Sequence, residues 1–254
     1  MEYIDKLIYL LPALFVAGVV DGIAGGGGVI ALPAYMLSGM PIHSCYACNK
    51  LQSGLGTLTA CIKYTKEKFV DIKTALIALP FTIIASFLST RIILHLNSDI
   101  IKIIIMICIP IAVAMMFIKL RITSKSVLKC NLNKRTILLS ALSGIILGAY
   151  DALFGPGGGT IAIVIYALFL NYDLRVSCGN GKIIIVVSNI TAVISYIMNG
   201  YMIYHIAIPC SIANMLGGYL GALIAIKKGP KIVLPTMIFV IMCVIIQSVL
   251  NFTM

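Results

Sequence analysis

The stretch DGIAGGGGVIALP, residues 21–33, places an aspartate and four consecutive glycines inside a run that is otherwise apolar enough for a membrane helix. Glycine is poor at holding a helix, because it loses more backbone freedom on folding than any other residue. In lipid every backbone amide needs an internal partner, so a broken helix is tolerated only where it is buried in protein or lines a cavity. The stretch therefore predicts a helix break that lines a site.

The whole chain has the composition of a membrane protein, with the lipid bilayer as its surroundings. Hydrophobic residues make up 61% of its 254 positions and charged residues 11%, which excludes an ordinary soluble domain. Runs of about 20 apolar residues, the length that crosses a bilayer, recur from end to end with short polar gaps. The first residues, MEYIDKLIYLLPALF, have no basic leader and no small-residue cleavage site, so we expect them to stay in the bilayer.

The net charge of +11 carries topology information and does not indicate a nucleic-acid partner, because most basic residues lie in short loops between apolar runs. The positive-inside rule puts such loops in the cytoplasm. The neutral segment 199–205 and both chain termini are then outside. Thirteen of the 19 lysines and arginines fall in three loops: Lys63, Lys66, Lys68 and Lys73; Lys119, Arg121, Lys125, Lys129, Lys134 and Arg135; and Lys227, Lys228 and Lys231.

The sequence repeats itself once. DALFGPGGGTIAIV at 151–164 matches the opening stretch: an aspartate, three residues, a glycine cluster and an apolar run. Farther along, CNKLQSGLGTL from Cys48 matches NGKIIIVVSNI from Asn180, which sets Lys50 opposite Lys182. We therefore divide this single membrane domain (1–254) into repeat 1 (1–120), a basic cytoplasmic linker (121–134) and repeat 2 (135–254).

Each repeat is expected to hold three membrane-spanning helices after its glycine motif. The arms around the first glycines, 7–22 and 28–40, reach only about 24 Å and 20 Å as helices, short of a hydrocarbon core about 30 Å thick. We therefore expect each glycine segment to be a re-entrant hairpin that returns to the side it came from. The predicted spans are 46–64, 72–94 and 99–118 in repeat 1, and 183–199, 203–226 and 231–252 in repeat 2.

This count gives each repeat an odd number of crossings, so the two repeats have opposite orientation in the membrane. The predicted fold is an all-α integral membrane protein built from two inverted-topology repeats, a plan typical of secondary transporters. The alternative is that each glycine segment is one kinked span, which gives four crossings per half and parallel repeats.

Two acidic residues, Asp21 and Asp151, are embedded in apolar runs at matching positions of the repeats. A charge at the bilayer centre costs about 2.5–3.5 kcal/mol on insertion scales, so such residues are candidates for function. One interpretation is that each carries a proton or a cation at the tip of its hairpin. The other is that each caps the break by accepting hydrogen bonds from glycine amides. The sequence leaves both open.

Each glycine cluster is followed by a new helix N-terminus, whose unpaired amides and partial positive charge favour an anion. Lys50 and Lys182 are expected to begin the helices after the hairpins and to add two cations, although a lysine near a helix end also reaches headgroups. Polar neighbours would complete a donor-rich lining. The predicted substrate-binding residues are Gly25, Gly26, Gly27, Gly28, Asn49, Lys50, Gln52, Ser53, Gly157, Gly158, Gly159, Thr160, Lys182, Ser188 and Asn189.

These motifs resemble the TauE/SafE sulfite exporter family, and within it the YfcA-like subgroup. The likeness rests on VDGIAGGGGVIALPA, NKLQSGLGTL, YDALFGPGGGTIA and the dipeptide at Ser188 and Asn189, and it extends over essentially the whole chain. The resemblance implies transport of a small sulfur-bearing anion, such as sulfite, a sulfonate or thiosulfate, across a prokaryotic plasma membrane.

The sequence thus favours a secondary transporter without enzymatic activity, with an anion site between the repeats and proton coupling as an option. A passive anion channel shares most of these features. An intramembrane thiol enzyme that uses Cys48 or Cys178 is a further alternative, but no nucleophile and base are paired in the sequence. We expect no cofactor and no metal ion. The direction of transport, the role of Cys45 and Cys48, and the formation of a homo-oligomer stay open.

Overall fold

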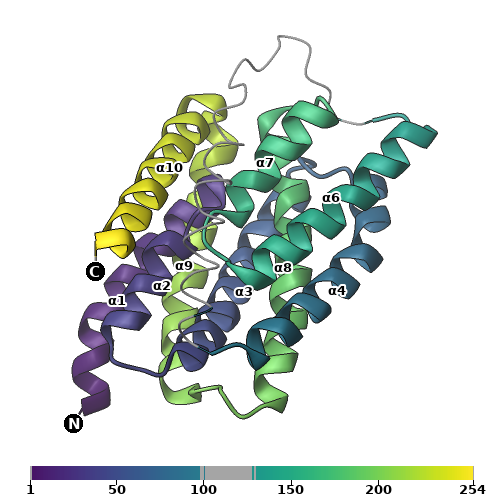
Figure 1. Ribbon diagram of the computed structural model, residues 1–254. Coiled ribbons are helices and arrows are strands. Elements are labelled where there is room, and N and C mark those ends of the chain that lie inside the picture. Colours follow the sequence, from purple (N-terminus) through teal and green to yellow (C-terminus); the bar gives the residue numbers. More distant parts are fainter. Residues whose placement is uncertain (1, 98–99, 101–127, 129, 254) are drawn as a thin grey trace.

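Long apolar segments fold as helices because a helix satisfies its own backbone hydrogen bonds, which the bilayer interior requires. The computed structural model describes residues 2–97, 100, 128 and 130–253, and these contain nine helices (Figure 1). The predicted span at 99–118 lies outside the described residues apart from Ile100. The helices are α1 (Glu2–Ala24), α2 (Gly28–Leu37), α3 (Ile42–Lys66), α4 (Ile72–His95), α6 (Lys134–Leu153), α7 (Gly158–Phe169), α8 (Leu174–Met198), α9 (Tyr204–Lys228) and α10 (Pro230–Thr253).

Five helices in the described part of the chain are long and apolar enough to cross a membrane. This confirms an all-helical protein suited to the bilayer. α3 is as long as α8, with 25 residues, but its sequence is more polar and includes Asn49, Lys50 and Gln52. The five segments are Asp5–Ala24, Ile72–His95, Lys134–Leu153, Leu174–Met198 and Tyr204–Lys228.

The glycines interrupt the chain at two equivalent places, between α1 and α2 and between α6 and α7. Glycines at both breaks adopt a left-handed conformation: Gly25 has a φ of 74° at the first, and Gly155 and Gly157 have φ values of 77° and 78° at the second. Residues with a Cβ rarely adopt this conformation, so glycine is required here. Figure 1 shows that α2 folds back beside α1, and α7 packs against α6.

The predicted length of the first hairpin arm is wrong. α1 has 23 residues and α6 has 20, which correspond to about 34 Å and 30 Å of helix, so each is long enough to cross the hydrocarbon core. The second arms are short, with 10 residues in α2 and 12 in α7. The prediction counted only the apolar run and omitted the polar first turns of α1, which contain Glu2, Asp5 and Lys6.

Small residues bring the helices close together, as is common in membrane proteins. α1 packs on α9 and α6 packs on α4 through glycines that leave no room for a Cβ. In both contacts the residue numbers rise together along the two helices, so each pair is parallel. The contacting pairs are Gly18 with Asn214, Gly22 with Gly218, Gly144 with Ala78, and Gly148 with Thr82.

α3 and α8 cross inside the bundle and are antiparallel. Gly54 of α3 lies against Asn189 of α8, whereas Asp71, beyond the end of α3, donates its amide to Asn180 near the start of α8. In the hydrogen bonds between α3 and α9, and between α4 and α8, the residue numbers rise together, so each of these pairs is parallel. Helices α1, α3 and α9 therefore run in one direction, and α4, α6 and α8 run in the other (Figure 1). These bonds join Cys48 with Ile203, Thr59 with Met215, Asn180 with Thr74, and Ser86 with Ser188.

Candidate functional site

Two buried ion pairs join the first half of the chain to the second. Lys50 Nζ lies 3.0 Å from Asp151 Oδ2 and also donates to the Asp151 carbonyl. Lys182 Nζ lies 3.4 Å from Asp21 Oδ2 and also donates to the Asp21 carbonyl. Each lysine is therefore paired with the aspartate of the opposite half.

The four side chains occupy equivalent places in the fold. Asp21 and Asp151 lie in the last turn of α1 and of α6, directly before the glycine breaks. Lys50 and Lys182 lie about two turns inside α3 and α8. The expectation that these lysines begin their helices is wrong, because α3 begins at Ile42 and α8 at Leu174, ahead of the predicted span starts at 46 and 183.

Protein surrounds all four charges. The exposed fraction is 1% for Lys50, 3% for Lys182, 3% for Asp151 and 8% for Asp21. The lysines therefore point into the protein and do not reach lipid headgroups. Among the described residues, the side-chain hydrogen bonds to the two carboxylates come from these lysines and from Thr57, not from glycine amides.

The two pairs differ in a further contact. Thr57 Oγ1 donates to Asp21 Oδ2 at 2.7 Å. The matching position in the second half is Asn189, which is 1% exposed and has no hydrogen-bond partner for Oδ1 or Nδ2 among the described residues. Leaving a buried polar group unpaired costs about 1–3 kcal/mol, so such a group needs an explanation.

The two glycine breaks touch each other. Gly25 packs so closely on Gly159 that a Cβ on either residue would overlap the backbone of the other. A Cβ on Gly28 would lie 3.1 Å from Pro156 Cα. Thr160 Oγ1 adds a hydrogen bond of 2.8 Å to the Ala24 carbonyl. Glycine at the breaks thus permits close backbone approach between the halves as well as the turn itself.

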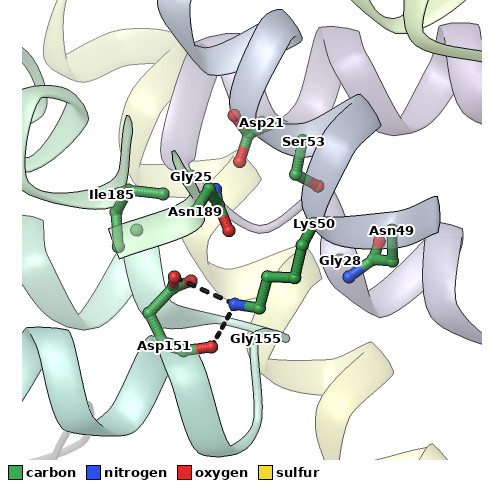
Figure 2. A pocket seen from close by; sticks show the side chains of 11 residues that line it. Asp21, Gly25, Gly28, Asn49, Lys50, Ser53, Asp151, Gly155, Ile185 and Asn189 are labelled. Carbon is green, nitrogen blue, oxygen red and sulfur yellow. Dashed lines mark hydrogen bonds and ion pairs between the residues drawn. The ribbon is translucent and has the colours of Figure 1, made fainter. Parts of the chain in front are cut away.

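A small cavity lies where the breaks meet the ion pairs. Figure 2 shows Lys50 reaching both the carboxylate and the carbonyl of Asp151, with the Asn189 side chain between Asp21 and the Lys50 ammonium in this view. The cavity volume is about 10 Å³, roughly what one water molecule needs, so a larger anion fits only after the walls move. The lining residues are Asp21, Gly25, Gly28, Asn49, Lys50, Ser53, Asp151, Gly155, Gly159, Ile185 and Asn189.

The cavity brings together about half of the predicted substrate-binding residues, namely Gly25, Gly28, Asn49, Lys50, Ser53, Gly159 and Asn189. Of the rest, Ser188 bonds to Ser86 of α4, and Gly26 packs against Val240 of α10. Ile185 was missed, because an isoleucine in an apolar run carries no signal. The predicted residues outside the lining are Gly26, Gly27, Gln52, Gly157, Gly158, Thr160, Lys182 and Ser188.

Sequence reasoning also missed a buried carboxylate, Asp71, because an acid in a loop is usually exposed. Asp71 is 4% exposed and accepts hydrogen bonds from the Tyr172 hydroxyl at 2.7 Å and from the Cys130 amide at 3.0 Å. It is the N-cap residue of α4, and this position before a helical run was the signal available. The network ties loops together beyond the end of α3 and lies apart from the cavity.

The thiols considered for sulfur chemistry are packed into the structure. Cys48 and Cys178 are buried and free, and they donate to the carbonyls of Ile203 and Ile23. Neither lines the cavity. Their contacts match those of small apolar side chains.

Comparison with known proteins identifies the family. The family model "Sulfite exporter TauE/SafE" matches residues 10–248, nearly the whole chain. The chain belongs to the TauE/SafE family. No solved structure matches it.

Relatives in the TauE/SafE family are described as transporters. A "Probable membrane transporter protein" of Haemophilus influenzae is 28% identical over 92% of this chain and 91% of its own length. YfcA of Escherichia coli K12, with the same description, is 25% identical over 94% of this chain and 91% of its own. ORF9 of a Sinorhizobium species is 27% identical over 92% and 88%. The TauE/SafE chain is accordingly a membrane transporter and not an enzyme.

Proposed function

We propose that this TauE/SafE protein is a secondary transporter of a small anion, with sulfur-containing oxyanions such as sulfite, sulfonates or thiosulfate as the substrate class. The observation that carries the proposal is the crossed pairing of Lys50 with Asp151 and of Lys182 with Asp21. Ionisable groups buried inside membrane proteins commonly mark substrate or ion pathways. The family description, sulfite exporter, supports the substrate class.

In this proposal the chain consists of two inverted repeats, 1–120 and 135–254, with a cytoplasmic linker at 121–134. Support comes from the helix directions, because α1 and α3 run opposite to α6 and α8. It also comes from the exchange of partners, since α1 packs on α9 of the other half and α6 on α4. Two opposed hairpins that meet at their tips would create a site near the bilayer midplane, as in other secondary transporters.

The anion is proposed to bind at the cavity between the glycine breaks, where the helix N-termini of α2 and α7 favour negative charge. Both lysines already have a carboxylate as counterion, so the anion must compete with Asp21 or Asp151. A carboxylate released inside the protein loses its cation, and an unpaired buried carboxylate is neutralised by taking up a proton. Anion binding and proton binding are therefore linked in this mechanism.

The proposed location is a bacterial plasma membrane with both chain termini outside. The relatives come from bacteria, and the basic loops that contain Lys66 and Lys228 lie at the same end of the antiparallel bundle. The positive-inside rule makes that end cytoplasmic. If each half crosses the membrane an odd number of times, the whole chain crosses it an even number of times, and both termini lie on the same side.

The experiment is a flux assay in proteoliposomes with sulfite, thiosulfate and methanesulfonate as probes. We expect uptake of at least one of these anions by the unmutated protein and a fall of about tenfold or more in Lys50→Ala or Lys182→Ala, since each removes a cation from a buried pair. Lys63→Ala, which removes a partly exposed lysine of α3 that pairs with Glu67, is the matched control. Absence of uptake for all three anions would overturn the substrate class, and unchanged flux in both site variants would overturn the site.

A further inference from the structure

The two ion pairs are not equivalent, and we infer that one of them binds the substrate while the other holds the protein together. In this assignment the anion binds between Lys50 and Asn189 and replaces Asp151 as the counterion of Lys50. The Lys182–Asp21 pair is a structural tie between the halves. The inference rests on the proposed function and deepens it by naming the residues that contact the anion.

The Lys182–Asp21 pair has the contacts of a fixed structural element. Asp21 accepts a hydrogen bond from Thr57 at 2.7 Å in addition to its contact with Lys182. Lys182 does not line the cavity, although Asp21 does. An entering anion would therefore meet the carboxylate of this pair before it met the lysine, which disfavours binding there.

Both members of the Lys50–Asp151 pair are accessible from the cavity, because both residues line it. Asn189 should hold Asp151 in the way that Thr57 holds Asp21, if the halves were equivalent. Instead both polar atoms of Asn189 are unpaired, and the side chain is buried in the cavity wall. A carboxamide offers two N–H donors and one acceptor oxygen, so an oxyanion beside Lys50 would satisfy its donor group.

Gln52 arranges further donors on the same side. Its Nε2 donates to Asn49 Oδ1 at 3.0 Å and to Ser53 Oγ at 2.9 Å. Because these bonds engage the acceptor atoms of Asn49 and Ser53, the Asn49 amino group and the Ser53 hydroxyl hydrogen are the groups that can donate to an anion in the cavity that both residues line. Gln52 is thus a positioning residue that turns its neighbours into hydrogen-bond donors.

The matching positions on α8 have no such donors. In the repeat alignment Asn49 corresponds to Gly181 and Ser53 corresponds to Ile185. Asn49 and Ser53 therefore have no donor counterpart on α8, and Lys182, the counterpart of Lys50, does not line the cavity. Several donors gathered beside one lysine suit a small oxyanion with several acceptor oxygens, once the anion has displaced the Asp151 carboxylate from Lys50.

The test compares Asn189→Leu with its repeat mate, Thr57→Val, in proteoliposomes with sulfite as the probe. We expect Asn189→Leu to raise the KM for sulfite about tenfold or more, because a hydrogen bond to a charged group is lost. We also expect its melting temperature in detergent to stay equal or rise, because the unpaired carboxamide is gone. Thr57→Val should do the reverse, with a lower melting temperature and a KM within about threefold of the unmutated value.

Three results would overturn the inference. One is an unchanged KM in Asn189→Leu, and another is an equal rise of KM in both variants. The third is a lower melting temperature with an unchanged KM in both Asn189→Leu and the smaller variant Asn189→Ala. That pattern is expected of a residue with a purely structural role. A failure of the unmutated protein to transport any of the three probe anions overturns the proposed function itself, and is thereby distinguished from these outcomes.

Discussion

Lys50 and Asp151 are 101 positions apart in the chain, yet their side chains meet at 3.0 Å inside the helix bundle. The contact links α3 of the first half to the hairpin tip of the second half. The Lys182–Asp21 pair makes the equivalent contact, with the lysine on α8 of the second half and the aspartate at the hairpin tip of the first half. The site is consequently close to neutral, and an arriving anion has to exchange with a carboxylate.

Breaking one member of the Lys50–Asp151 pair is expected to destabilise the protein. Lys50→Met leaves Asp151 buried without its cation, which typically costs about 3–5 kcal/mol. The double variant Lys50→Met with Asp151→Asn should be more stable than Lys50→Met alone, because no uncompensated charge remains. Unfolding in detergent measures both, with Lys63→Met, at a partly exposed lysine, as the control that should change little. A double variant less stable than the single one would contradict a direct pair.

The positions of these charges could be predicted from the sequence, but their pairing could not. Asp21, Asp151, Lys50 and Lys182 are identifiable because a charge within an apolar run is rare and because the two halves repeat. Whether a lysine contacts the aspartate of its own half or of the other depends on how α3 and α8 cross. Helix crossing follows from close contacts such as Gly54 with Asn189, which local sequence does not encode.

The contact between the glycine breaks should be intolerant of a methyl group. Gly25→Ala combines a positive φ of 74° with a Cβ that overlaps the Gly159 backbone. Gly39→Ala is a matched control, with a φ of 71° and no atom within 4 Å of the new Cβ. The control should lose about 1–2 kcal/mol of stability for its backbone conformation, and Gly25→Ala about 1–3 kcal/mol more for overpacking.

Thermal unfolding and anion flux measure this pair of variants. Gly25→Ala should also lose flux, because the breaks wall the cavity, while Gly39→Ala should keep it. Equal stability and equal flux in the two variants would contradict close contact between the hairpin tips.

Anion transport should depend on a proton gradient through Asp151. Asp151→Asn removes the carboxylate that would take up a proton when Lys50 binds the anion, so flux should no longer respond to an imposed pH difference while anion binding persists. The measurement is initial sulfite uptake at fixed internal pH and varied external pH. Flux that ignores the gradient in the unmutated protein would rule out proton coupling.

Membrane orientation can be tested with two cysteine substitutions at exposed positions. Glu67 follows α3 and Asn199 follows α8, and the antiparallel arrangement puts them at opposite ends of the bundle. A membrane-impermeant maleimide should label Asn199→Cys in intact cells and Glu67→Cys only after permeabilisation. The unmutated protein gives the background from its own cysteines. The reverse labelling pattern would contradict an outer location of the termini.

The ends of the helices and the burial of polar side chains were the features hardest to predict from the sequence. Apolar content marked the middle of each helix well, but α1 and α8 begin with polar or weakly apolar residues that continue the helix. Asp71 was expected to be exposed because it lies in a loop, yet it is buried and accepts a hydrogen bond from Tyr172. Asp71 and the polar start of α8 were missed for one reason, namely that tertiary contacts stabilise polar groups which the sequence alone assigns to the surface, whereas Asp5 in the first turns of α1 is exposed.

The central claim is that the cavity beside the Lys50–Asp151 pair carries a small anion through alternating conformations, and sulfite counterflow in proteoliposomes tests it most directly. The account predicts saturable uptake of labelled sulfite that unlabelled internal sulfite accelerates, with a loss of about tenfold or more in Lys50→Met and near-normal rates in Lys63→Met. Uptake that rises linearly with concentration, shows no acceleration by internal sulfite, or survives Lys50→Met unchanged would contradict it.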